Sequence, residues 1–397
     1  MKRLIIGVLF VVLAANVSAQ RRSGTGRQVP EPAAGEALAG LTAAQRADFT
    51  DGLGDFTEVE RVTDGLGPVF NERSCVACHS VPAIGGGSNR LVTRFATRVN
   101  GLFDALASLG GSLVQDHAIG GRDGVAHNFR PEVVPPSATI TVRRRTTPLF
   151  GLGLVDATPD SDFIAAAQQQ AARGDGVAGR VNMVDNLRAG MKTVGKFGWK
   201  AQVPSLFQFS GDALVNEMGI TTPDFPNENC PQGNCAELAF NPAPGINDDG
   251  SGPIALTNYM SRLAAPPRGP LSGDVAAGEA TFERIGCAAC HTATQRTGSN
   301  PIAALDRKIY HPYSDFLLHD MGALGDDLEM GNSTGAEMRT APLWGLRFIN
   351  RYLHDGRATT LDQAILAHAG QARGARDQFA GLAADAKAKL IAFLNSL

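Results

Sequence analysis

The pattern Cys-x-x-Cys-His occurs twice in this 397-residue chain, at Cys75-Val-Ala-Cys78-His79 and at Cys287-Ala-Ala-Cys290-His291. Two cysteines at this spacing reach the two vinyl groups on one porphyrin edge, and the next histidine then lies under the iron. With 6 Cys and 8 His in the chain, chance predicts roughly 0.002 such patterns. The sequence therefore predicts two covalently attached haems, bonded to Cys75, Cys78, Cys287 and Cys290 and ligated by His79 and His291.

Other fates of paired cysteines fit this pattern less well. A four-cysteine zinc site would leave both histidines without a role and would join pairs more than 200 residues apart, far beyond the spacing of a zinc ribbon. A redox-active Cys-x-x-Cys expects a strand before it and a helix after it, and neither flanks these pairs. Haem attachment remains the favoured interpretation.

The chain begins like an exported protein. Lys2 and Arg3 precede an almost wholly apolar stretch at 4–15, and Val17-Ser-Ala19 resembles a cleavage site. A retained anchor is the alternative, but the apolar stretch is short for a membrane span. Export to the periplasm also explains the third pair, Cys230 and Cys235, because an oxidising compartment favours a local disulfide.

Composition favours helices and long loops. The formal net charge is -3, about -5 without Lys2 and Arg3, and no basic run suggests nucleic acid. Aromatic residues make up 6% and glycines number 46, which argues against a β-sandwich. We predict a mainly α chain of two cytochrome c-type haem domains, with no membrane span after signal removal.

Composition and motifs divide the chain into five segments. The predicted segments are a signal peptide (1–19), a flexible lead-in (20–40), an N-terminal cytochrome c-like haem domain (41–210), a loop-rich connector with the disulfide (211–270) and a C-terminal cytochrome c domain (271–397).

Apolar spacing predicts helices at several places. In the last domain, a helix over 274–285 carries Gly278 and Phe282 four residues apart and should pair with an apolar stripe over 390–397, the usual cytochrome c plan. Further helices are predicted over 254–263, from Asp160 or Ser161 to Gly174, and over 361–369, where Thr360 and Gln363 form a capping box and Leu361, Ile365 and His368 share a face.

Several segments resemble the bacterial di-haem oxidoreductases, some of which are labelled thiol oxidoreductases. The matching segments are Gly65-Leu-Gly-Pro-Val-Phe-Asn71, Gly151-Leu-Gly-Leu-Val155, Gly195-Lys-Phe-Gly-Trp-Lys-Ala201, Tyr313-Ser-Asp-Phe-Leu-Leu-His-Asp-Met-Gly322, Arg339-Thr-Ala-Pro-Leu-Trp-Gly345 and Tyr352-Leu-His-Asp-Gly356. This family is similar to the dihaem cytochrome c peroxidases. The resemblance implies two facing cytochrome c domains and redox chemistry, with calcium between the domains as an option that no ligand loop marks.

The resemblance also implies a distal ligand for the C-terminal haem. In the peroxidases this residue follows a segment like 352–356, and the matching residue here is His368, with a backbone-bonded core histidine as the alternative. Met321, Met330 and Met338 are fallback ligands, and a Met ligand would raise the potential. The family commonly has Glu where this chain has Gln371.

Other candidate residues have less specific signals. His117 and His127 are ligand or proton-shuttle candidates at the first haem, although an ordinary loop histidine is the more common case for each. Trp199 is the preferred electron relay over Trp344, with packing as the alternative for both. His319 and His354, each followed by Asp, are expected to be core histidines oriented by that carboxylate or to support the C-terminal haem.

Three functions remain open at this stage. The first is a peroxidase-like oxidoreductase in which electrons enter at the C-terminal haem from a small redox protein or quinol-linked donor, and a small oxidant such as peroxide is reduced at the N-terminal haem. The second is a non-enzymatic electron carrier with two six-coordinate irons. A thiol-directed enzyme is the weakest, because the paired cysteines would already be bonded to haem.

Overall fold

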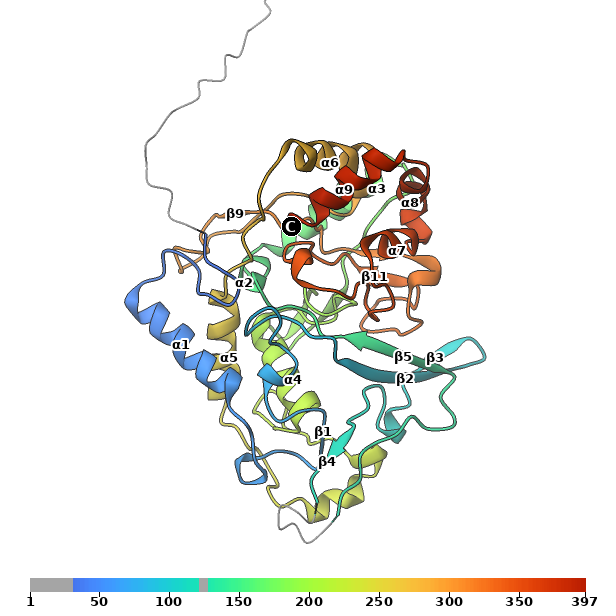
Figure 1. Cartoon of the computed structure of the whole chain (residues 1–397). Coiled ribbons are helices and arrows are strands. Elements are labelled where there is room, and N and C mark those ends of the chain that lie inside the picture. The colour runs from blue at the N-terminus through green and yellow to red at the C-terminus, as the bar shows by residue number, and fades with distance from the viewer. Residues whose placement is uncertain (1–30, 121–127) are drawn as a thin grey trace, which may run out of the picture. The chain divides into compact units, whose positions relative to one another are not determined.

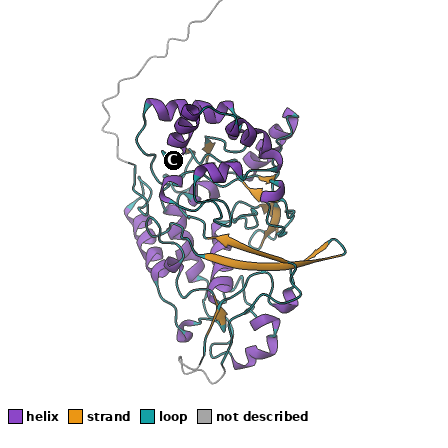
Figure 2. Ribbon diagram, turned by 45° about the vertical axis from the view of Figure 1, so that its right-hand side comes forward, coloured by secondary structure: helices purple, strands orange, loops and turns teal. Residues whose placement is uncertain are grey.

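Helices, short antiparallel sheets and long loops alternate along the chain (Figure 2). The computed structural model describes residues 31–120 and 128–397. The predicted signal peptide, His127 and most of the predicted lead-in lie outside these residues. The described helices are α1 (Ala43–Thr57), α2 (Leu152–Asp156), α3 (Asp160–Arg173), α4 (Leu206–Met218), α5 (Ser251–Arg262), α6 (Gly273–Arg284), α7 (Leu361–Leu366), α8 (Arg373–Ala380) and α9 (Ala384–Leu394).

The named strands that pair in the described residues do so antiparallel, mostly as two short strands, and the larger sheet has β2 between β3 and β5. The strands are β1 (Val69–Phe70), β2 (Leu91–Val99), β3 (Leu102–Asp104), β4 (His117–Ala118), β5 (Ile140–Arg145), β6 (Met183–Asn186), β7 (Met191–Val194), β8 (Gln295–Arg296), β9 (Ile309–Tyr310), β10 (Leu318–Asp320) and β11 (Glu337–Arg339).

The expectation of a mainly α chain is therefore met only in part. The sheet of β3, β2 and β5 is the clearest departure. Its longest pairing joins Leu91 to Arg145 and Ala96 to Ile140. Both strands mix β-branched residues with arginines, so the alternation of apolar and polar residues that marks a strand is weak in the sequence.

Most predicted helices occur close to their expected bounds. The helix expected over 274–285 is α6, capped by the Ser272 hydroxyl, which accepts from the Val275 N–H. The helix expected to reach Gly174 is α3, and Gly174 adopts a φ of 65° there, a left-handed conformation that suits glycine. The helix expected to reach residue 369 ends at Leu366, so His368 lies just beyond α7.

Two pairs of crossing helices organise the molecule from Pro32 to Leu397, which forms one unit. Helix α6 packs against α9, as predicted, and α1 packs against α5 (Figure 1). Each crossing uses a glycine. A side chain at Gly278 would collide with the Lys389 carbonyl oxygen, and a side chain at Gly52 would collide with the Ala255 carbonyl oxygen.

Separate apolar clusters accompany the two helix pairs. One cluster is formed by buried apolar residues from segments between Phe49 and Trp344, and it includes Phe56 and Tyr259. Another is built around Phe282 and Phe393. No described helix combines the length and the apolar character that a membrane crossing requires.

Candidate functional site

Both Cys-x-x-Cys-His segments adopt the same local structure. Each opens with a single 3₁₀ turn, Cys75–Ala77 in one case and Cys287–Ala289 in the other. In each, the histidine N–H donates to the carbonyl oxygen of the first cysteine at 3.0 Å. The turn therefore holds both cysteines and the histidine of each segment in one short bend.

The two histidines are also oriented in the same way. The Nδ1–H of His79 donates to the Gly86 carbonyl at 3.0 Å, and that of His291 donates to the Tyr313 carbonyl at 2.9 Å. Burial lowers the pKa of each histidine to about 4. Both rings are therefore neutral near pH 7 and present an unprotonated Nε2, the form that ligates a metal.

An aromatic ring contacts each histidine from the preceding helix. The rings of Phe56 and His79 lie 6.1 Å apart, and those of Phe282 and His291 lie 6.2 Å apart. Each phenylalanine follows its helix-crossing glycine by four residues, Gly52 or Gly278. The spacing of Gly278 and Phe282 predicted this arrangement in the C-terminal half, and Gly52 and Phe56 repeat the spacing in the N-terminal half.

A cavity of about 610 Å³ lies beside the second segment. Cys287, Cys290 and His291 line it together with His368, and the rest of the lining is largely apolar. Its volume lies in the range of ligand and cofactor pockets. The donor set and the apolar walls fit a haem bonded through the two cysteines.

His368, the predicted distal ligand, lines the same cavity as His291. Its Nδ1–H donates to the Ala364 carbonyl at 2.8 Å, so Nε2 is the nitrogen left for a ligand. Burial is the main cause that lowers the pKa of His291, and the charges of His368 and His319 lower it further. Leu361, Ile365 and His368 all line the cavity, which confirms the shared face.

The fallback methionines differ in position. Met321 and Met338 line the cavity. Met330 instead accepts a hydrogen bond at its Sδ atom from Nη1 of Arg144, at 3.0 Å. The first two therefore remain alternative ligands.

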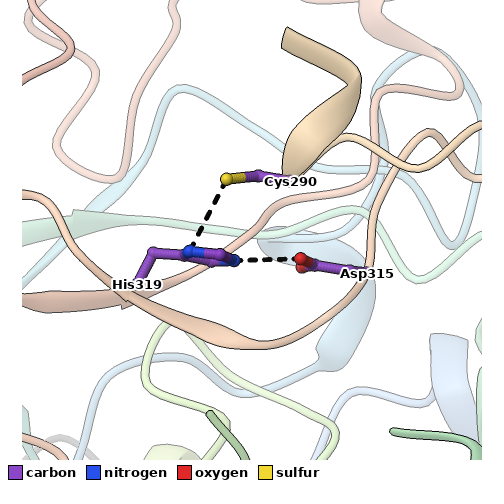
Figure 3. A group of neighbouring side chains, drawn as sticks. All are labelled: Cys290, Asp315 and His319. Carbon is purple, nitrogen blue, oxygen red and sulfur yellow. Dashed lines mark hydrogen bonds and ion pairs between the residues drawn. The ribbon is translucent and has the colours of Figure 1, made fainter. Parts of the chain in front are cut away.

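A hydrogen-bonded group lies next to the second cysteine pair (Figure 3). Nε2 of His319 lies 2.9 Å from Asp315 Oδ2, and Nδ1 lies 2.8 Å from Gln371 Oε1 and 3.5 Å from Cys290 Sγ. Burial opposes protonation of His319, but Asp315 and Cys290 raise its pKa to about 11. The prediction that the following Asp320 orients His319 is wrong, because Asp315, four residues earlier, does so.

The same group could be considered as a metal centre. Within the described residues, Cys290, Asp315 and His319 bring ligand atoms within 4.8 Å of one another. Both nitrogens of His319 already bond oxygen acceptors, and Cys290 is the expected partner of a haem vinyl group. We therefore interpret this group as support for the second cysteine pair.

The remaining predicted residues divide between the cavity and the packed interior. Trp199 lines the cavity and donates its Nε1–H to the Arg145 carbonyl at 3.0 Å. His354, which is 4% exposed, also lines the cavity and contacts the Trp199 ring. Asp355 pairs with Arg357 rather than with His354.

The second tryptophan, Trp344, packs in the first apolar cluster, against Tyr310.

Near the first segment, the structure reveals an acid that sequence reasoning missed. Glu217 of α4 accepts a hydrogen bond from Asn71 Nδ2 at 2.8 Å, and burial raises its pKa. Its charge also raises the pKa of the Cys78 thiol, although burial is the larger cause. No sequence signal links Glu217 to residues more than a hundred positions earlier, since the contact arises only in the fold.

Two further polar groups accompany the first segment. The Tyr259 hydroxyl is buried and has no hydrogen-bond partner in the described part of the chain, and the charge of Cys75 is one cause of its raised pKa, after burial. His117 is exposed, stacks on Phe70 and lies 2.6 Å from Asp116. An unpartnered hydroxyl beside a cysteine pair is compatible with a bound group there.

Cys230 and Cys235 form a disulfide with an S–S distance of 1.98 Å. The loop between them packs on distant segments. Gln232 N–H donates to Glu132 Oε1 at 2.7 Å, and Gln232 Nε2 donates to the Leu109 carbonyl at 2.7 Å. The disulfide therefore shapes a loop that joins several parts of the N-terminal half.

Two cysteine turns, each with an oriented neutral histidine, are the arrangement expected of a protein that binds two haems. A family model described as "Di-haem oxidoreductase, putative peroxidase" matches residues 136–397. The match covers more than half of the chain, and the chain belongs to this family. The matched residues include the second cysteine segment, whereas the first lies before them.

Structural comparisons find distant similarity. A hydrazine synthase of Kuenenia stuttgartiensis matches with 14% identity and a TM-score of 0.41, covering 98% of this chain and 100% of that one. A MauG-like protein associated with microbial copper homeostasis matches with 13% identity and a TM-score of 0.41, covering 94% of each chain. The diheme peroxidase BthA from Burkholderia thailandensis matches with 16% identity and a TM-score of 0.31, covering 52% of this chain and 66% of that one. Similarity at this level carries no functional conclusion. No curated protein matches the chain.

Proposed function

We propose that this chain is an exported, periplasmic two-haem c-type cytochrome that acts as a peroxidase-like oxidoreductase. Cys75 and Cys78 would hold one haem and Cys287 and Cys290 the other. Electrons enter at the C-terminal site from a small redox protein or quinol-linked donor, and a small oxidant such as peroxide is reduced at the N-terminal site. The proposal rests mainly on the repeated arrangement of glycine, phenylalanine, cysteine pair and oriented histidine.

The two halves of the molecule suggest the domain assignment. Since α1 packs on α5 and α6 packs on α9, we assign α5 to the N-terminal haem domain rather than to the connector. Each domain then contains one crossing helix pair and one cysteine turn. The C-terminal domain keeps the proposed bounds of 271–397.

The bound haems supply iron that takes up and releases electrons. The chain orients the axial histidines. The Gly86 and Tyr313 carbonyls hold the Nδ1–H groups of His79 and His291, so Nε2 of each ring is offered to the iron. His368, which lines the same cavity as His291, offers a third Nε2, and two nitrogen ligands would favour electron transfer over substrate binding at that site.

Reduction of hydrogen peroxide to two molecules of water takes up two electrons and two protons. Glu217 is the residue that we propose to hold a proton at the N-terminal site, because burial keeps its carboxyl group protonated to higher pH than usual. His117 with Asp116 is a more exposed alternative. Trp199, which lines the C-terminal cavity, is the proposed relay for electrons leaving that site.

A non-enzymatic electron carrier is the second candidate. The amide at Gln371, where the family commonly has a carboxylate, favours it. In a carrier both irons would have two axial ligands, and the oxidised protein would contain only low-spin haem. In the peroxidase-like protein, the N-terminal haem would have an open or displaceable sixth position.

Mass, spectra and turnover test this proposal on the mature protein. The mass should exceed that of the bare polypeptide by two porphyrins. Electron paramagnetic resonance of the oxidised or half-reduced protein should contain a high-spin component, and peroxide should be consumed with a reduced donor. Two low-spin haems without turnover would favour the carrier, and fewer than two porphyrins would exclude both.

A further inference from the structure

Two arginines line the C-terminal cavity although both are buried. Arg145, the last residue of β5, is 6% exposed, and Arg339, the last residue of β11, is 7% exposed. Both belong to the cavity lining together with Trp199. The backbone links all three, because Trp199 Nε1–H donates to the Arg145 carbonyl and Arg339 N–H donates to the Trp199 carbonyl at 2.9 Å.

Neither guanidinium group has a carboxylate within ion-pair distance in the described residues. The charge of Asp315 acts on Arg339, but Asp315 is itself paired with His319 at 2.9 Å. Within the same residues, the buried Nε of Arg145 has no hydrogen-bond acceptor. Arg339 donates from Nε to the Gly198 carbonyl at 2.7 Å and from Nη1 to the Thr340 carbonyl at 3.4 Å. The neighbouring Arg144, in contrast, is paired with Asp326 at 2.7 Å.

An unpaired buried cation is costly and needs an anion. Burial lowers the pKa of Arg145 and of Arg339 to about 10, so both groups still carry their charge near pH 7. Two buried guanidinium groups in the lining of one cavity therefore favour two negative charges inside it.

The cofactor expected in this cavity carries two such charges. Thioether bonds to Cys287 and Cys290 use the vinyl groups of a haem, and its two propionate carboxylates remain free. Guanidinium groups bind carboxylates strongly through paired N–H donors. Resting on the proposed function, we infer that Arg145 and Arg339 pair with the two propionates of the C-terminal haem and hold them ionised.

This pairing predicts an effect on the haem potential. A cation beside the propionates offsets their negative charge. Without it, the uncompensated charge stabilises the oxidised iron, and the potential falls. The pKa of the propionate also rises when its partner is lost, so the potential becomes dependent on pH.

The experiment compares four full-length mature holoproteins by spectroelectrochemical titration of both haems, from about pH 5 to about pH 9. Arg145→Gln should lower one of the two potentials and make it more dependent on pH. Arg145→Lys keeps a charge and should stay closer to the wild type. Arg143→Gln, at an exposed position on the same strand, should match the wild type.

The outcomes separate this inference from the proposed function. Fewer than two porphyrins on the wild type would refute the proposed function itself. Two porphyrins with unchanged potentials and pH dependence in Arg145→Gln would overturn only the propionate pairing. If Arg145→Gln loses the C-terminal haem, recovery of haem in Arg145→Lys supports the pairing, and equal loss in both variants counts against it. Arg145 suits this test because its buried Nε has no acceptor to lose among residues 31–120 and 128–397.

Discussion

His319 and Gln371 are joined by a hydrogen bond of 2.8 Å from the imidazole Nδ1 to the amide Oε1. The Gln371 amide is held in this orientation because its Oε1 accepts from the Ala178 N–H at 3.3 Å and its Nε2 donates to the Ala178 carbonyl at 3.2 Å. Gln371 also lines the C-terminal cavity. A neutral amide therefore contacts a buried imidazole, and both side chains line the cavity of the expected haem.

Gln371→Glu tests what this neutral group does. The carboxylate would place a second negative charge beside His319, which already faces Asp315, and a net negative charge stabilises the oxidised iron. We expect the potential of the C-terminal haem to fall, as measured by spectroelectrochemical titration. Gln363→Glu adds the same charge at an exposed position on α7 and should leave the potential nearly unchanged. Equal shifts in both variants would mean that the His319 contact has no special effect.

His368→Gly tests the distal ligand of the C-terminal haem. Removal of the imidazole should convert one haem from a low-spin to a high-spin spectrum, because the glycine leaves the sixth position to water or to nothing. His311→Gly is a matched control, since His311 is exposed and hydrogen-bonded to Thr294. An unchanged spectrum in His368→Gly would exclude His368 as a ligand and leave Met321 or Met338 as the candidate ligand.

Glu217→Gln tests the proposed proton donor. The amide cannot supply a proton, so peroxide turnover should fall by about a hundredfold or more, as for other acid–base residues. Haem content and both spectra should stay as in the wild type. Asp212→Asn is the control on the same helix, because burial also raises the pKa of Asp212 and no role is proposed for it. A small, equal loss in both variants would exclude Glu217 as the donor.

Local sequence predicted the helices and the turns of the site because the signals there are local. Ser272 and Thr360 each cap the helix that follows, and Gly174 ends α3. His368 was placed by the family resemblance together with the apolar face it shares with Leu361. A spacing of three or four residues is enough to bring these side chains together.

The parts that sequence could not supply depend on distant contacts. His319 lies on β10, and its two ring nitrogens bond different segments. Nε2 bonds Asp315 rather than Asp320, and Nδ1 bonds Gln371. Glu217 reaches Asn71 across 146 positions. In the sequence, Arg145 and Arg339 resemble ordinary charged residues, and only the fold buries both of them in the lining of one cavity.

The disulfide between Cys230 and Cys235 should contribute to stability but not to haem content. Replacing both cysteines by serine should lower the free energy of unfolding by about 2 kcal/mol, the loop-closure value for so short a ring. Mass spectrometry should still find two porphyrins. Reductant is the control in chemical unfolding, since it should destabilise the wild type and leave the double variant unchanged. Loss of haem would mean that the docked loop around Gln232 is needed for a haem site.

Glu228 should make stability fall as pH rises. Burial raises its pKa to about 8 from its ordinary value of 4.5, and its Oε2 is buried without a partner in the described residues. Between these two values the folded chain holds a proton that the unfolded chain releases. The free energy of unfolding contributed by this group therefore falls from about pH 4.5 to about pH 8 and is level above that.

Glu228→Gln removes this dependence because an amide does not ionise, while its oxygen can still accept from the Asn229 N–H. The variant should equal the wild type near pH 4.5 and exceed its stability at pH 8 and above by about 1 kcal/mol or more, allowing for partial exposure. Urea unfolding across this range measures the difference. Glu283→Gln, at an exposed position on α6, should follow the wild-type curve. A Glu228→Gln curve parallel to the wild type would show that the carboxyl group is already ionised in the folded protein at low pH.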